Sequence, residues 1–266
     1  MIKTDISYIG LLLGLILLII PIWFLHRYKT GLVRASLIGA ARMLVQLFLI
    51  GLYLKYLFYY NIWWVNLIWA MVMTVAATGT ALSRTRLKRE FLAVPLFVAF
   101  FTTAIVVGFY FLGLVLDLGF ALHELFTARY FIPIFGLLLG NMLGVNVMAL
   151  NTYYSGLRRE YQMFNYMIGN GASLHEATAP FISKAMITAF NPCIANMAVM
   201  GLVAMPGTMI GQILGGSDPT TAIRYQILIV VITFVASMIS LMITIGLSNN
   251  RCFDKKSRLK NVLRDK

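Results

Sequence analysis

Sulfur-bearing side chains gather in one apolar stretch of the sequence. Met197, Met200, Met205 and Met209 follow Cys193 within a short distance along the chain. Thiol and thioether sulfur are soft ligands, which suit Cu(I) and similar metal ions. Methionine also fills irregular gaps in packed interiors, and packing is the interpretation that this pattern favours. The sequence leaves the metal, and any ligands for it, unknown.

A second candidate set combines amide, hydroxyl and thioether groups. Between residues 130 and 155, a stripe of such side chains recurs with the helical period and therefore shares one face of a helix. This stripe either forms hydrogen bonds between helices or lines the pathway of a solute. The candidates for a substrate pathway, from this stretch and a later one, are Asn141, Met148, Thr152, Asn191, Asn196 and Met205.

Other kinds of site have no matching pattern. The chain lacks the G-x-x-x-x-G-K-[ST] loop that holds nucleotide phosphates, and His26, His123 and His175 are too far apart for a zinc site. No nucleophile–base pair is recognisable, and no buried carboxylates suggest a proton relay. The sequence therefore predicts no catalytic residue, and neither an enzyme nor a proton-driven transporter.

These residues lie in a chain that is too apolar for a soluble protein. Hydrophobic residues make up 60% of it and charged residues 12%, with a mean hydropathy of +0.84. Soluble domains carry about 25% charged residues, and about 20 apolar residues cross a bilayer as a helix. We predict an all-α integral membrane protein with about seven transmembrane helices, at 6–25, 41–59, 63–82, 92–116, 130–155, 185–206 and 224–247.

Basic residues set the expected orientation. The net charge is +13, and most Lys and Arg residues fall in alternate connections and in the tail, 251–266. The positive-inside rule places these in the cytoplasm, with the N-terminus outside and the C-terminus inside. We expect residues 1–250 to form a permease domain that crosses the inner or plasma membrane several times. Because the basic residues flank apolar runs, the expected partner is the lipid bilayer and not nucleic acid.

Two glycine series predict close helix packing. Each repeats every four residues, a spacing that lets helix backbones approach one another in a membrane. The contact is either within the bundle or at a subunit interface that can move. The residues are Gly136, Gly140, Gly144, Gly207, Gly211 and Gly215.

The connection 156–185 is the most informative cytoplasmic segment. Ser173 and Glu176 have the spacing of a capping box, which predicts the start of a helix. Pro180 is expected to end this helix after about two turns. An isolated helix this short is marginal in water, so it is expected to dock on a partner through Gly171, Ala172, Ser173, Glu176 and Ala177.

This segment resembles the coupling helix of ABC transporter permeases, which inserts into an ATPase subunit. Further motifs extend the resemblance from about residue 34 to 247. In order, they are R-x-x-x-Q-L-x-x-x-G from Arg42, I-P-I-x-G from Ile132 with G-N-M from Gly140, G-L-V-x-M-P-G-x-M-x-G from Gly201, and D-P-x-x-A-I-R-Y-Q-I from Asp218. Together they resemble the Fet-type iron-export permease family, which includes plant permeases linked to aluminium tolerance.

The resemblance implies a permease that forms a homodimer and pairs with two separate ABC ATPase subunits. This chain would bind no cofactor, since ATP and Mg would sit on the partner subunit. Export of iron or another metal ion is the implied activity. Ala195 and Ala198 stand where we expect a polar or charged pair in relatives, so the cargo can differ. The alternatives are an ABC exporter of a nucleotide sugar or other small organic solute, and an ATP-independent channel or carrier.

Overall fold

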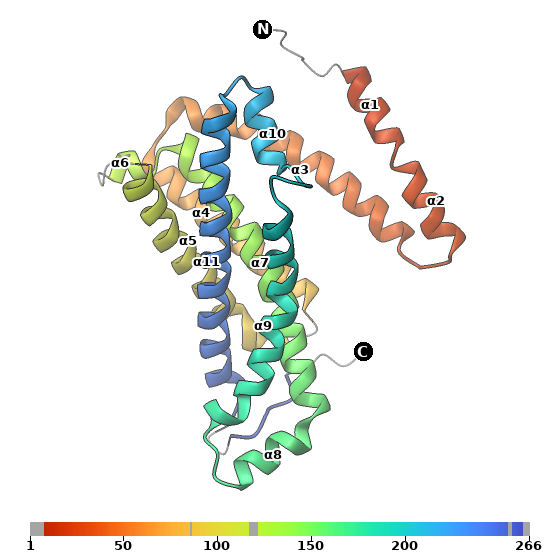
Figure 1. The fold of residues 1–266 in the computed structure, drawn as a ribbon, viewed down its shortest axis with the longest axis vertical. Helices are drawn as coiled ribbons and strands as arrows, with labels where there is room; N and C mark the ends of the chain where they lie inside the picture. The colour runs from red at the N-terminus through yellow and green to blue at the C-terminus, as the bar shows by residue number, and fades with distance from the viewer. Residues whose placement is uncertain (1–7, 86, 117–121, 255–256, 263–266) are drawn as a thin grey trace. The chain divides into compact units, whose positions relative to one another are not determined.

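The computed structural model describes residues 8–85, 87–116, 122–254 and 257–262, and most of these are helical (Figure 1). The chain divides into two compact units, Met1–Tyr60 and Asn61–Lys266. The candidate functional residues lie in the second unit. The all-α class expected from the sequence is confirmed.

The described part of the first unit, residues 8–60, contains three helices. The predicted span 6–25 is interrupted, because α1 (Tyr8–Ile16) and α2 (Ile19–Arg27) flank Leu17 and Leu18. The backbone N–H groups of these two leucines bond to carbonyls three residues earlier, which tightens the helix locally. A turn then leads to α3 (Val33–Tyr60), which begins earlier than the predicted span at 41.

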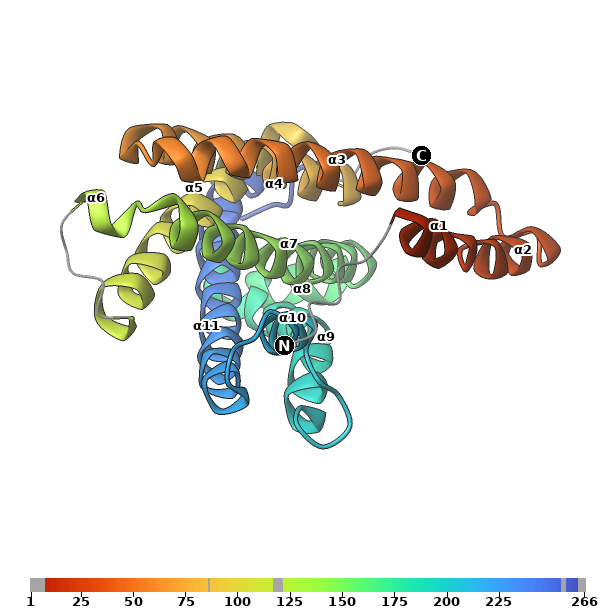
Figure 2. The same ribbon diagram turned by 90° about the horizontal axis from the view of Figure 1, so that it is seen from above.

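The second unit is a bundle centred on one long helix. This helix, α7, packs against α4, α5, α9 and α11, while α11 also packs against α5. Figures 1 and 2 both show α10 beside α9 and α11. The elements are α4 (Trp63–Arg84), α5 (Arg89–Phe109) continuing as a π-helical turn (Tyr110–Val115), α6 (Leu122–Leu125), α7 (Ala128–Arg159), α8 (Tyr161–Gly169), α9 (Leu174–Val199), α10 (Gly207–Leu214) and α11 (Pro219–Cys252).

Polar side chains join α7 to α11 inside an otherwise apolar core. Asn146 donates a hydrogen bond to Ser240 Oγ over 2.9 Å, and the Tyr154 hydroxyl donates one to Ser248 Oγ, also over 2.9 Å. All four residues are buried. Lipid offers no partner to a polar group, so pairing between helices satisfies these groups and holds the two helices in register.

Among the residues that the structure describes, six helical segments are long and apolar enough to cross a bilayer: Ile9–Arg27, Val33–Tyr60, Trp63–Arg84, Arg89–Val115, Ala128–Arg159 and Pro219–Cys252. They make this chain a multi-pass membrane protein. The remaining predicted span, 185–206, corresponds to the second half of α9 and the loop after it. Lys184, Asn191 and Asn196 lower the mean hydropathy of this helix, which explains why it is not among the six.

The start of α9 is as predicted, but its length is not. Ser173 caps the helix, and the reciprocal bonds of a capping box with Glu176 are both present. The prediction that Pro180 ends the helix is wrong, because α9 continues through Pro180 and Pro192 to Val199. Membrane helices tolerate proline where neighbouring helices and hydroxyl side chains compensate.

The two ends of the bundle carry different elements. Figure 1 shows α8 lying across the end at which α7 finishes and α9 begins, while α10 lies at the opposite end. The C-terminal tail reaches the α8 end, where the Val262 carbonyl accepts a hydrogen bond from the Lys88 N–H over 2.8 Å. The orientation predicted from basic residues places this end in the cytoplasm.

Candidate functional site

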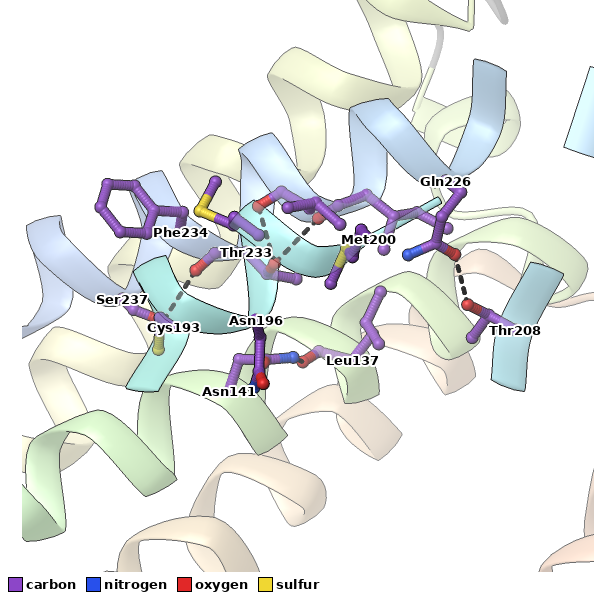
Figure 3. Close-up of a pocket in the computed structure, with 13 residues that line it drawn as sticks. Leu137, Asn141, Cys193, Asn196, Met200, Thr208, Gln226, Thr233, Phe234 and Ser237 are labelled. Atoms are coloured by element: carbon purple, nitrogen blue, oxygen red, sulfur yellow. Dashed lines mark hydrogen bonds between the residues drawn. The ribbon is translucent and has the colours of Figure 1, made fainter. Parts of the chain in front are cut away.

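A cavity of about 220 Å³ lies between α7, α9, α10 and α11 (Figure 3). Its lining is mixed, because amide and hydroxyl groups share it with sulfur and apolar side chains. None of the described residues that line it is charged. The polar lining residues are Asn141, Asn196, Thr208, Gln226, Thr233 and Ser237.

Helical spacing explains why α11 turns its polar groups to one side. Gln226, Thr233 and Ser237 are separated by seven and then four residues, so they share a face. Thr233 Oγ1 donates to the Ile229 carbonyl over 2.9 Å, and Ser237 Oγ donates to the Thr233 carbonyl over 2.7 Å. Each hydroxyl proton is therefore used within the helix, and the oxygen lone pairs remain available to a solute.

On α9, a sulfur and an amide face the same cavity. Cys193 and Asn196 are three residues apart and share one face of the helix, and Met200, the C-cap residue just after it, lines the same cavity (Figure 3). Across the cavity, Asn141 of α7 donates to the Leu137 carbonyl over 2.9 Å. The Asn141 side-chain oxygen is left as an acceptor.

A hydrogen bond between side chains ties the short helix α10 to α11. Thr208 Oγ1 donates to Gln226 Oε1 over 2.5 Å, and Figure 3 shows this contact at the edge of the cavity. Because α10 has only eight residues, propensity alone cannot hold it in place. The Thr208–Gln226 bond thus helps to position the cavity wall.

A second and larger cavity, of about 520 Å³, adjoins the first. The two share Met197, Met200, Gln226 and Val230. The second cavity is more apolar and is bounded by α9, the loop after it, α10 and α11. Its sulfur-bearing residues are Met197, Met200, Met205 and Met209.

The predicted pathway residues separate into two groups. Asn141 and Asn196 line the smaller cavity, and Met205 lines the larger one. Met148, Thr152 and Asn191 line neither of these cavities; Thr152 donates to the Met148 carbonyl over 3.0 Å. Sequence reasoning missed Thr208, Gln226, Thr233 and Ser237, although the spacing of the last three on one helix face could have identified them.

The predicted packing glycines also differ in their surroundings. A methyl group added at Gly136 would lie 2.9 Å from Met73 Cε of α4. One at Gly215 would lie 3.2 Å from the Gly211 carbonyl oxygen of its own turn. Apart from the adjoining residues and the backbone of the same helix, no atom of the described residues lies within 4 Å of a methyl at Gly140, Gly144, Gly207 or Gly211. For these four, a packing role stays a prediction.

The predicted coupling residues lie in the turn between α8 and α9 and in the first turn of α9. Gly171 has a φ of +90°, a conformation that other residues rarely adopt, and it reverses the chain direction. Ser173 and Glu176 are exposed, whereas Ala177 packs inside. The hydrogen bond from the Ser173 side chain, with one from the Ser173 N–H, lowers the pKa of the Glu176 carboxyl.

An ion pair joins the α7–α8 junction to α9. Glu160, between α7 and α8, accepts a hydrogen bond from Arg159 over 2.8 Å and lies 3.6 Å from Lys184 Nζ of α9. The hydrogen bond from Arg159 and the charge of Lys184 lower the pKa of the Glu160 carboxyl. These pairs are exposed, so they contribute orientation more than stability.

Hard metal ligands do not cluster in the described residues. No group of three or more His, Cys, Asp or Glu side chains there could hold a metal ion. Cys193 and Cys252 are both free thiols. Any metal ion entering the cavities would therefore meet thioether, thiol, amide and hydroxyl groups.

Comparison with known proteins gives matches over nearly the whole chain. The "UPF0014 membrane protein YjkA" of Bacillus subtilis is 27% identical over 255 residues, covering 96% of this chain and 98% of that protein. The "Probable iron export permease protein FetB" of Escherichia coli is also 27% identical, covering 96% and 95%. The rice "UPF0014 membrane protein STAR2" is 32% identical over 43% of this chain and 40% of its own length.

No solved structure matches this chain. The family described as "Uncharacterised protein family (UPF0014)" matches residues 8–253, which is most of the chain. The resemblance that the sequence motifs indicated is thereby confirmed. This chain is a member of the UPF0014 family of membrane proteins.

Proposed function

We propose that this chain is the permease subunit of an ABC transporter that exports iron or another metal ion, with energy from a separate ATP-binding subunit. The observation that carries the proposal is the match along 96% of the chain to a protein named as a probable iron export permease. The membrane-spanning fold and the cavity between its helices support a transport role.

The proposal assigns ATP and Mg to the partner subunit. The sequence has no nucleotide-binding loop and no proton relay, so transport against a gradient requires an external source of energy. The turn between α8 and α9, with the start of α9, is the proposed docking element: Gly171, Ala172, Ser173 and Glu176 would meet the partner, while the buried Ala177 would hold the segment on the bundle. Its exposed capping box and its position at one end of the bundle support this role.

Helix α9 provides a direct mechanical link in this proposal. It begins at the proposed docking turn and, within one continuous helix, carries Cys193, Asn196 and Met197 to the cavity. A helix of 26 residues extends about 39 Å at about 1.5 Å per residue. Movement of the turn by the ATPase would therefore shift one wall of the cavity against α11.

A homodimer is part of the proposal. Gly140 and Gly144 are exposed on α7, and apart from the adjoining residues and the backbone of α7 itself, no described atom lies within 4 Å of a methyl at either position. A second copy of the chain would supply the close contact that this spacing permits.

The character of the cavity bears on the cargo. A nucleotide sugar carries phosphate groups, which proteins bind with Arg, Lys or helix N-termini. No Lys or Arg is among the described residues that line either cavity. A metal ion therefore suits this lining better than a nucleotide sugar.

The test is assembly with the cognate ATP-binding subunit. Ala172→Arg and Glu176→Lys should each reduce co-purification of the ATPase at least tenfold while the permease still inserts in the membrane. Asn250→Lys, a charge added to an exposed site at the same end of the bundle, should leave co-purification unchanged. Assembly at the wild-type level in both docking variants would contradict the coupling role.

Transport by the reconstituted complex tests the cargo and the need for ATP. Ferrous iron should stimulate ATP hydrolysis more than a sugar nucleotide does. Vesicles that contain only this chain should show no selective solute flux without nucleotide. Fast flux under those conditions would replace the proposal with an ATP-independent channel or carrier.

A further inference from the structure

We propose that the larger cavity, between α9, α10 and α11, binds a soft monovalent metal ion such as Cu(I) or Ag(I) through methionine thioethers. As a statement about cargo, this inference rests on the proposed transport function. As a statement about a binding site, it stands on the cavity alone.

The geometry brings together methionines from two segments of the chain. Met197 and Met200 are three residues apart, so they lie one turn from each other on the same side of α9. Met205 lies in the loop before α10, and Met209 lies in its first turn. All four line the cavity opposite α11. A multidentate sulfur site requires several thioether-bearing residues around one space, and this cavity has four.

The ligand chemistry favours a soft ion over a hard one. Thioethers are neutral, polarisable donors, which select ions such as Cu(I), whereas carboxylates and carbonyls suit Mg, Ca and Mn. None of the described residues lining this cavity is Asp, Glu, Lys or Arg. A neutral lining also favours a single charge, because the cost of removing an ion from water rises steeply with its charge.

Packing is the competing explanation for these methionines, and the cavity argues against it. A methionine that fills a gap closes it. Here a space of about 520 Å³ remains open beside the four side chains, and 62% of the Met205 surface is exposed. The thioethers therefore line an accessible space instead of completing a core.

Sulfur also continues from this cavity toward the smaller one. Cys193, Met197 and Met200 follow each other at four and three residues, along one side of α9. Met197 and Met200 line both cavities, and Cys193 lines the smaller one. An ion held by the methionines can thus exchange from one sulfur ligand to the next without crossing a purely apolar wall.

Silver ion is the probe, because Ag(I) is a soft monovalent ion that does not change oxidation state in air. Titration calorimetry uses the purified full chain carrying Cys193→Ser, because a thiol binds Ag(I) more tightly than a thioether does. In detergent micelles and chloride-free buffer, this chain should show saturable binding. The double variant Met200→Leu, Met205→Leu should bind Ag(I) at least tenfold more weakly. Leucine is close in volume to methionine and keeps the packing, and gel filtration with a thermal unfolding curve checks the fold.

Two further variants serve as controls for the effect of the double variant on Ag(I) binding. Met163→Leu, in α8 away from the cavities and 47% exposed, should leave the affinity for Ag(I) unchanged. Cys252→Ser removes a thiol outside both cavities and should also leave it unchanged. Absence of Ag(I) binding by the Cys193→Ser chain, equal affinity in the double variant, or displacement of Ag(I) by an equal concentration of Fe(II) would overturn the site. None of these results depends on the ATPase, so loss of the site is distinguishable from failure of the proposed function.

Discussion

Asn146 of α7 and Ser240 of α11 form a hydrogen bond of 2.9 Å between two buried side chains. The same Asn146 amide group donates to the Met142 carbonyl of its own helix over 2.9 Å. The Asn146 side chain thus donates one hydrogen bond to the neighbouring helix, α11, and one to its own helix, α7. This pair fixes how far α7 and α11 can slide past one another, and these two helices form one side of the smaller cavity.

Removing this pair should destabilise the bundle by an amount that depends on which partner is lost. Ser240→Ala should lower the free energy of unfolding by about 0.6 kcal/mol, the average for a hydrogen bond between membrane helices. Asn146→Ala also leaves a void in the core, and should cost about 2 kcal/mol.

Chemical unfolding in mixed micelles measures both changes. Thr102→Ala is the control, because Thr102 is exposed and bonds to carbonyls of its own helix, Val98 over 2.7 Å and Ala99 over 3.5 Å. A loss of stability in Thr102→Ala as large as in Asn146→Ala would refute the importance of the pair.

Gly136 and Gly144 make a matched pair for testing helix packing. Alanine at Gly136 places a methyl 2.9 Å from Met73 Cε, which must move away, whereas alanine at Gly144 meets no described atom within 4 Å. Gly136→Ala should therefore lower the melting temperature by a few degrees. Gly144→Ala should raise the stability of the monomer, since alanine is favoured over glycine in a helix by about 1 kcal/mol.

Self-association of the Gly136→Ala and Gly144→Ala variants provides a second test. If Gly144 packs against a second copy, Gly144→Ala should weaken self-association in crosslinking or analytical ultracentrifugation. Gly136→Ala should leave self-association intact. Destabilisation of the monomer by Gly144→Ala would show that its surroundings are closed.

Breaking the Thr208–Gln226 bond should loosen α10. Thr208→Val retains the shape of the side chain but cannot donate to Gln226 Oε1. With about 0.6 kcal/mol lost, amide hydrogen exchange in α10 should become about threefold faster. Thr220→Val, whose hydroxyl is not part of this contact, should leave α10 unchanged, and an equal effect of both variants would contradict the prediction.

The start of α9 should depend on pH through Glu176. The hydrogen bond from Ser173 lowers the pKa of this carboxyl below its ordinary 4.5, so the folded turn prefers the charged form. The contribution of the Glu176 carboxylate to the stability of the helix start is therefore fully present above pH 4.5. It is lost as the pH falls through the lowered pKa of the folded state.

Hydrogen exchange of the 173–178 amides, measured between pH 3 and 6 and corrected for intrinsic rates, reports this loss as reduced protection at the acid end. Glu176→Gln keeps the geometry of a capping box but does not titrate. Its protection should be independent of pH over that range. The same acid dependence in the glutamine variant would assign the effect to another group.

The sequence predicted most of the fold from properties that act locally. Apolar runs set the helices, and Ser173 with Glu176 marked the start of α9 because the capping box needs only four residues. The end of that helix was mispredicted at Pro180. Its continuation depends on packing, since Phe181 and Ala185 are buried beyond the proline, and such contacts are not visible in a single segment.

The cavities were harder to anticipate for a similar reason. Asn141 was a candidate because it belongs to the polar stripe between residues 130 and 155, and Asn196 because it is a polar residue beside Ala195 and Ala198. Thr208 and Gln226 were missed because they are 18 positions apart in the sequence. Their hydrogen bond exists only because α10 packs against α11, and that contact is not visible in either segment alone. Met148 was chosen from periodicity alone, and periodicity identifies a face without identifying what that face meets.

The two prolines inside α9 divide it into three stretches. A proline ring lacks an N–H, so the carbonyl four residues earlier loses its bond and the helix bends most easily there. Pro180 lies near the proposed docking turn and Pro192 just before the cavity. Phe181, Ala185 and Ala189 are buried between the two prolines, so this segment of α9 is expected to move as one rigid unit. A tilt of the helix at Pro180 can therefore be transmitted to the part of α9 after Pro192, while the segment between them keeps its packing contacts.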